Sequence, residues 1–250
     1  MDKKAQQNQI QLDGFNDVSL WQLLPCGNGH ALKKLKEIVN SELNSHPNRS
    51  SNKPFSLLIS GPFGKRTHTF AVLRALGYQY IEHIPAALLS NITDLVEFFR
   101  NSNPETGYVI SDLHSMNTAL LKKYYQVLTE GNLITYNYNT HEKLMFPVLS
   151  PVIMTIKYQN KVPPYLNECF NYSVELGEYT TQQKELIALQ RLKYANIEIQ
   201  DEEVLKTLML YSLSDLNDLI KLLDLSIMVM MGEGKNVLTI PHIKRGKELF

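Results

Sequence analysis

Residues 55–69 read Phe55-Ser-Leu-Leu-Ile-Ser60-Gly61-Pro-Phe-Gly64-Lys65-Arg66-Thr67-His68-Thr69. The first six residues, 55–60, form a short apolar run that predicts a buried strand. The glycines of 61–64 interrupt this run, and a helical pattern resumes over 67–76. A strand, a glycine turn and a helix in this order begin a nucleotide-binding α/β unit.

The same alternation continues toward the C-terminus. Apolar runs predict strands, helical spacing of apolar residues predicts helices, and the segments around 139–142 predict a hairpin turn. Strands that alternate with helices predict an α/β fold with a mainly parallel sheet covered on both faces. The expected strands are 78–84, 108–112 and 152–156, the expected helices are 31–43, 91–100 and 117–128, and the expected hairpin pairs 132–138 with 143–146.

From Thr180 onward the pattern is helical. Helices are expected over 181–194, 201–211 and 213–232, with a short last helix from Pro241. Asp201 and either Ser214 or Asp215 are suited to cap helix N-termini. We therefore expect three parts: a flexible tail over 1–16, an α/β body over 17–177, and a small all-α lid over 178–250.

Composition restricts the class of protein. The chain has 250 residues, 44% hydrophobic and 20% charged, which is typical of a globular protein. Lys plus Arg and Asp plus Glu both total 25, so there is no global basic field and direct DNA binding is expected to be weak or absent. No apolar stretch is long enough for a membrane span, and the polar N-terminus has no secretory signal. The two cysteines and the missing signal favour a cytoplasmic protein.

The N-terminal tail contains the sequence Gln11-Leu12-Asp13-Gly14-Phe15. A directional amide followed by two apolar side chains suits an extended peptide that crosses a preformed groove. This stretch resembles the short motif by which bacterial proteins bind the replication sliding clamp. Gln11, Leu12, Asp13 and Phe15 would make the contacts, and Gly14 replaces the usual apolar residue. Losing one apolar side chain costs about 1–3 kcal/mol, so whether the motif still functions stays open.

The whole arrangement resembles the AAA+ ATPases, in which a phosphate-binding α/β body precedes a helical lid. Three stretches resemble the DnaA/Hda-like group: Pro25-Cys-Gly-Asn28, the lid helix 216–225, and Val237-Leu-Thr-Ile-Pro241-His-Ile-Lys244. The middle of the chain, including the hairpin near 132–146, looks like RuvB and the clamp-loader subunits. The resemblance implies an AAA+ fold and oligomers, either homo-oligomers or hetero-oligomers.

A nucleotide would be bound by Gly61, Pro62, Phe63, Gly64, Lys65, Arg66 and Thr67. A P-loop reads Gly-x-x-x-x-Gly-Lys-Ser/Thr, in which the lysine reaches the phosphates and the hydroxyl holds Mg²⁺. Standard spacing puts Thr67 at the lysine position, whereas a two-residue deletion puts Lys65 there. Either alignment damages the phosphate cradle. Binding of ATP or ADP therefore stays open, and Mg²⁺ is expected only if nucleotide binds.

The second expected motif, Asp-Glu at a strand end, is also incomplete. The chain reads Ser111-Asp112-Leu113. Asp112 therefore takes the position either of the acid that holds the metal or of the acid that polarises water, but not both. Asp112 could equally be a helix N-cap. The seven histidines have no metal-ligand spacing, so no metal site is expected.

Two arginines that the resemblance implies are replaced. Cys169 stands where the family has the Arg that reaches a neighbouring subunit's nucleotide, and the lid Arg falls near Asn217. No neutral residue supplies the charge of an Arg finger. Because four catalytic features are degraded together, we assign no catalytic residue and expect no efficient ATPase.

The resemblance thus implies a catalytically degenerate, Hda-like AAA+ adaptor of DNA replication control. Its partners would be the sliding clamp and DnaA or another AAA+ protein. The alternatives are a divergent RuvB-like or clamp-loader-like ATPase in replication or recombination, and a structural subunit of a hetero-oligomeric AAA+ ring.

Overall fold

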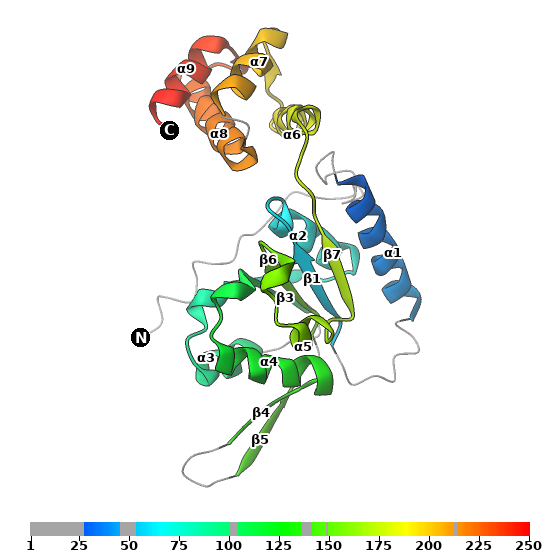
Figure 1. Cartoon of the computed structure of the whole chain (residues 1–250). Coiled ribbons are helices and arrows are strands. Elements are labelled where there is room, and N and C mark those ends of the chain that lie inside the picture. Colours follow the sequence, from blue (N-terminus) through cyan, green and yellow to red (C-terminus); the bar gives the residue numbers. More distant parts are fainter. Residues whose placement is uncertain (1–27, 46–53, 101–104, 137–141, 149, 213–214) are drawn as a thin grey trace. The chain divides into compact units, whose positions relative to one another are not determined.

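A computed structural model describes residues 28–45, 54–100, 105–136, 142–148, 150–212 and 215–250 (Figure 1). These residues form two compact units. The first comprises 30–176, and the second comprises 28–29 together with 177–250. The first unit is α/β, and the second is mainly helical.

The first unit is built on a five-stranded parallel sheet with the order β2-β3-β6-β1-β7. Every residue of β1 and β6 is buried, as expected for central strands of a sheet covered on both faces. The expected α/β class with a mainly parallel sheet is therefore confirmed. The strands are β1 (Ser56–Ser60), β2 (Tyr80–Pro85), β3 (Thr106–Ser111), β6 (Val152–Ile156) and β7 (Tyr172–Glu175).

Helices cover both faces of this sheet (Figure 1). α1 (Gly29–Ser45) and α2 (Lys65–Ala75) pack on one face, against Leu57 and Ile59 of β1. α3 (Ile92–Arg100) and α4 (Thr118–Glu130) pack on the other face. Four short helical turns link these elements: η3 (Ala86–Leu88), η4 (Leu113–Ser115), η5 (Gln159–Lys161) and α5 (Pro164–Asn167).

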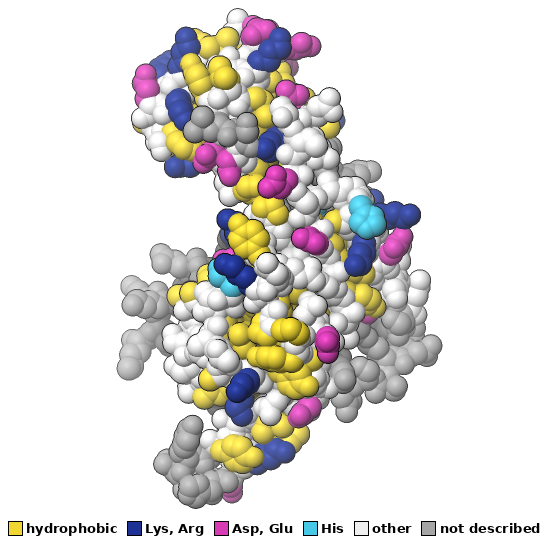
Figure 2. All heavy atoms as spheres, viewed as in Figure 1, with side chains coloured by type: hydrophobic (Ala, Val, Ile, Leu, Met, Phe, Trp, Pro, Cys, Tyr) yellow, Lys and Arg dark blue, Asp and Glu magenta, His cyan; other side chains and the backbone are white. Residues whose placement is uncertain are grey.

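A two-stranded hairpin forms a separate sheet of the first unit. β4 (Asn132–Tyr136) pairs antiparallel with β5 (Lys143–Pro147), as the sequence predicts. Tyr136 and Met145 are more than half exposed, at 56% and 53%, and Leu144 is also exposed. Figure 2 shows hydrophobic side chains over this hairpin. The hairpin therefore offers apolar surface that the described residues do not cover.

The second unit contains four helices, α6 (Thr181–Tyr194), α7 (Glu202–Tyr211), α8 (Leu216–Gly232) and α9 (Ile240–Glu248). Two strands of two residues each pair in parallel: β8 (Glu198–Ile199), between α6 and α7 in the sequence, and β9 (Val237–Leu238), between α8 and α9. Asp201 caps α7 and Asp215 caps α8, each through its carboxylate. Of the helices in the described part of the chain, none has both the length and the apolar character that a bilayer crossing requires.

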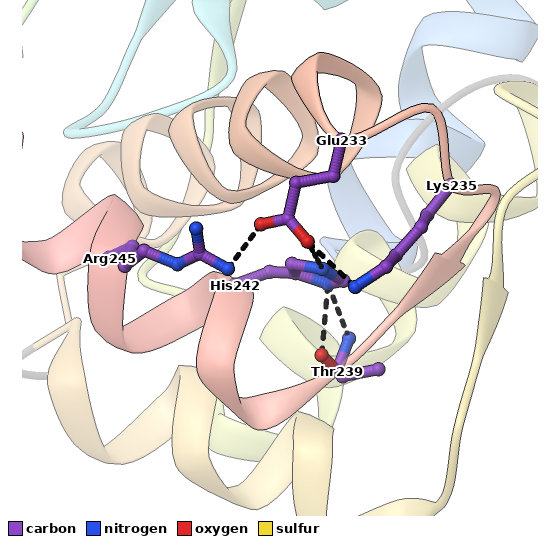
Figure 3. A network of polar contacts seen from close by, with 5 residues as sticks. All are labelled: Glu233, Lys235, Thr239, His242 and Arg245. Carbon is purple, nitrogen blue, oxygen red and sulfur yellow. Dashed lines mark hydrogen bonds and ion pairs between the residues drawn. The ribbon is translucent and has the colours of Figure 1, made fainter.

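A polar network ties the end of α8 to the start of α9 (Figure 3). The backbone N–H of Thr239 donates to Nδ1 of buried His242 at 3.0 Å, so Nε2–H donates to Glu233 Oε2 at 3.3 Å. Glu233 also pairs with Lys235 at 2.7 Å and with Arg245. The hydrogen bond from Lys235, with the charge of Arg245, holds the pKa of Glu233 below its ordinary value. The network fixes the tautomer of His242 and the first turn of α9.

Candidate nucleotide-binding site

Only four residues, Gly61–Gly64, separate the end of β1 from the first residue of α2, which is Lys65. A P-loop has six residues before its lysine. The start of the helix thus fits the alignment with a two-residue deletion, and Arg66 takes the position of the Mg²⁺-binding hydroxyl. Thr67 lies exposed in the first turn of α2. The loop has fewer backbone N–H groups to offer a phosphate chain than a full P-loop.

Gly61 is held closely between neighbouring strands. Its N–H donates to the carbonyl of Ile156 at 3.1 Å, and Leu176 N–H donates to the Ser60 carbonyl at 2.8 Å. The φ of Gly61 is 135°, and a Cβ atom built there would lie 2.4 Å from the Leu176 carbonyl oxygen. Only glycine fits both this conformation and this contact.

Lys65 turns back onto the loop that precedes it. Its Nζ donates to the Gly61 carbonyl at 2.7 Å and to the Pro62 carbonyl at 3.3 Å. Burial lowers the pKa of Lys65, the carboxylate of Asp112 opposes that shift, and Lys157 adds to it. The charges of Asp112, which follows β3, and of Lys157, which follows β6, therefore both act on Lys65.

His68 holds the other end of the loop. Its Nδ1 lies 2.8 Å from the carbonyl of Gly64, which has a φ of 77°. A carbonyl only accepts hydrogen bonds, so Nδ1 carries the proton and Nε2 is an acceptor. Nε2 is buried and has no hydrogen-bond partner among the described residues. Burial lowers the pKa of His68, and the bond to Gly64 opposes this shift in part.

This arrangement predicts that acid weakens the first unit through His68. Because the pKa is lower in the folded than in the unfolded chain, the stabilisation is complete above about pH 6.5 and is lost as the pH falls through the folded pKa. His68→Asn keeps an N–H donor for Gly64 but cannot titrate. Urea unfolding at pH 7.5 and 5.5 should show a smaller loss of stability in the variant. Equal losses in the two proteins would show that His68 does not contribute to the pH dependence of stability.

Asp112 follows β3 at the same sheet edge, but the catalytic pair is incomplete. It adopts a left-handed conformation, with φ 57° and ψ 49°, and its carbonyl accepts from Ser115 N–H at 2.8 Å. Asp112 stands at the N-cap position of η4, as the alternative interpretation predicts, but its side chain makes no capping hydrogen bond; Asn117 caps α4 through its side chain. Leu113 is buried in the core. The position after Asp112, where the motif would have a second carboxylate, is therefore taken by an apolar side chain.

Cys169 and Asn217, which stand where the resemblance implies arginines, both make local hydrogen bonds. Cys169 Sγ donates to the Tyr165 carbonyl at 3.0 Å, just after α5. Asn217 lies exposed in the first turn of α8, where its N–H donates to the Asp215 carboxylate at 2.7 Å. Neither side chain carries a charge. Among the described residues, no three His, Cys, Asp or Glu side chains gather in a way that could hold a metal ion.

Sequence reasoning missed three residues of this region. Lys157 follows β6 at the carboxyl edge of the sheet, where ligands of α/β folds bind. Its place directly after a predicted strand could therefore have marked it as a candidate site residue. Gln159 Nε2 donates to Ser173 at 3.1 Å, and its Oε1 lies 3.4 Å from the Ser60 hydroxyl. His68 gave no signal, because its contact with Gly64 appears only in the folded chain. The clamp-motif residues 11–15 lie outside the described residues.

Comparison with known proteins identifies the fold. No protein-family model and no curated protein matches the sequence. Solved structures do match: a mutant of Thermotoga maritima RuvB shares 14% identity at a TM-score of 0.70, covering 90% of this chain and 70% of that one. The Thermotoga maritima RuvB Holliday junction branch migration motor matches at 14% identity and a TM-score of 0.65, over 93% and 73% of the two chains. The chain therefore has the AAA+ P-loop fold.

Proposed function

We propose that this protein is a catalytically degenerate AAA+ adaptor of DNA replication control, which works by binding and not by hydrolysing ATP. The observation that carries the proposal is the shortened Gly61–Gly64 loop, which Lys65 closes. A loop of this length cannot wrap a triphosphate as a P-loop does. The buried Leu113 stands where the motif of an active ATPase has its second acid.

The tail supplies one binding element of the proposed adaptor. Gln11, Leu12, Asp13 and Phe15 would tether the chain to the sliding clamp, and the body and lid would face a DnaA-type AAA+ partner. A tether raises the local concentration of a weakly bound partner, so even a modest second contact becomes effective. The exposed Tyr136, Leu144 and Met145 of the β4–β5 hairpin add apolar surface of the kind found at protein interfaces.

The clamp contact predicts a specific loss of binding. Leu12→Ala with Phe15→Ala removes both apolar anchors, which should weaken binding to the cognate clamp by at least about 100-fold. Trp21, six residues beyond Phe15, is the only tryptophan of the chain, so its fluorescence can report on binding near the motif in a titration with a clamp that lacks tryptophan.

Asp17→Ala, just beyond the motif, is the matched control and should bind like the wild type. Absence of wild-type binding would remove the clamp from the proposal.

A second candidate function is a divergent ATPase of the RuvB or clamp-loader type. The likeness to RuvB over 90% or more of the chain favours it, as does the proximity of Lys65 and Asp112. This function requires Mg²⁺-dependent turnover that Lys65→Ala and Asp112→Ala both abolish. The adaptor requires no turnover.

A further inference from the structure

The ammonium of Lys65 already has partners within its own loop. It donates to the carbonyls of Gly61 and Pro62 at 2.7 and 3.3 Å. Both carbonyls belong to the four-residue segment that precedes the helix. In a longer P-loop the corresponding lysine reaches the β- and γ-phosphates. Here the lysine at the start of α2 spans the shortened turn and closes it.

The rest of the loop is fixed independently at both ends. Gly61 bonds to Ile156 and lies in close contact with Leu176. Gly64 accepts from both the backbone N–H and the Nδ1–H of His68, at 3.1 and 2.8 Å. With its ends held by the sheet and by α2, the loop has little freedom to open around a phosphate chain.

The two carbonyl contacts of Lys65 oppose the entry of a phosphate. The side chain is half-buried, with Asp112 as its nearby anion and Lys157 as a nearby cation. An incoming phosphate would have to draw the ammonium away from both carbonyls. Polar groups that lose their partners without regaining water carry a desolvation cost. Nucleotide would therefore compete with contacts that the chain makes by itself.

We infer that Lys65 is an internal brace that holds the Gly61–Gly64 loop in one conformation without nucleotide, so that partner binding does not depend on nucleotide. That partner binding does not depend on nucleotide rests on the proposed adaptor function. That Lys65 braces the loop does not. An adaptor of this kind is permanently competent to bind, because no hydrolysis step resets it.

Hydrogen exchange of the full-length protein without nucleotide tests the brace. Lys65→Met keeps a chain of similar length but removes the ammonium, and amides of residues 61–67 should then exchange about tenfold faster. The matched control is Lys122→Met, an exposed lysine on α4, which should leave this segment unchanged. Unchanged exchange in Lys65→Met would overturn the brace.

A second measurement uses the wild type, so it remains decisive if Lys65→Met does not fold. Addition of ADP and Mg²⁺ should leave exchange of residues 61–67 and clamp affinity unchanged. Slower exchange in this segment with ADP would show that Lys65 serves nucleotide and would overturn the inference. If ADP leaves hydrogen exchange of residues 61–67 unchanged and the protein does not bind the clamp, the adaptor function fails and the brace stands.

Discussion

Gly61→Ala is expected to destabilise the first unit severely. The backbone conformation, with φ at 135°, costs a residue with a side chain about 1–3 kcal/mol. The new Cβ would also lie 2.4 Å from the Leu176 carbonyl oxygen and 2.7 Å from its Cβ, and such overpacking costs about 1–3 kcal/mol more. Neither contact can relax by rotating a flexible side chain. The sum, about 2–6 kcal/mol, reaches the lower end of the stability of a typical domain, about 5–15 kcal/mol.

Gly77→Ala separates the two causes. Gly77 also has a positive φ, 92°, but a Cβ there meets no atom within 4 Å. It should therefore lose only the conformational part, about 1–3 kcal/mol. Urea unfolding of both variants, with hydrogen exchange to identify the unit affected, gives the comparison. Equal destabilisation of the two would show that the contact with Leu176 is unimportant.

Gly246→Ala is expected to open the second unit at the crossing of α8 and α9. A Cβ at Gly246 would lie 2.6 Å from Ser226 Oγ and 2.9 Å from its backbone nitrogen. Alanine normally favours a helix over glycine by about 1 kcal/mol, but overpacking at this contact should exceed that gain by about 2 kcal/mol. Exchange of the buried amides of α8 and α9 should rise accordingly.

Gly232→Ala, at the end of α8, is the matched control. A Cβ there meets nothing within 4 Å, so the variant should be at least as stable as the wild type. A stable Gly246→Ala protein would mean that the two helices can separate without loss.

The sequence predicts the α/β class because β1, β3 and β6 are dominated by buried apolar residues bounded by turn signals. β7 escaped prediction because it is a short edge strand of four residues, of which only Val174 is buried. β8 and β9 have two residues each, too few for any periodicity. Asp201 and Asp215 were predictable as caps because capping depends on local sequence.

The loop residues of the candidate site were predictable from the sequence, but their contacts were not. The glycines and Lys65 follow from the loop pattern alone. The bonds of Lys65 to its own loop depend on a turn only four residues long, and the spacing left two alignments open. The contact of Gly61 with Leu176 joins positions more than 100 residues apart. Such a contact follows from the packing of β1 beside β7.

The proposed adaptor does not turn over ATP. The most direct test is the rate of phosphate release by the purified full-length chain with ATP and Mg²⁺, beside the Lys65→Ala/Asp112→Ala double variant. The account predicts that both proteins release phosphate at the rate of the protein-free blank. Mg²⁺-dependent release by the wild type that the double variant loses would contradict it and establish a divergent ATPase.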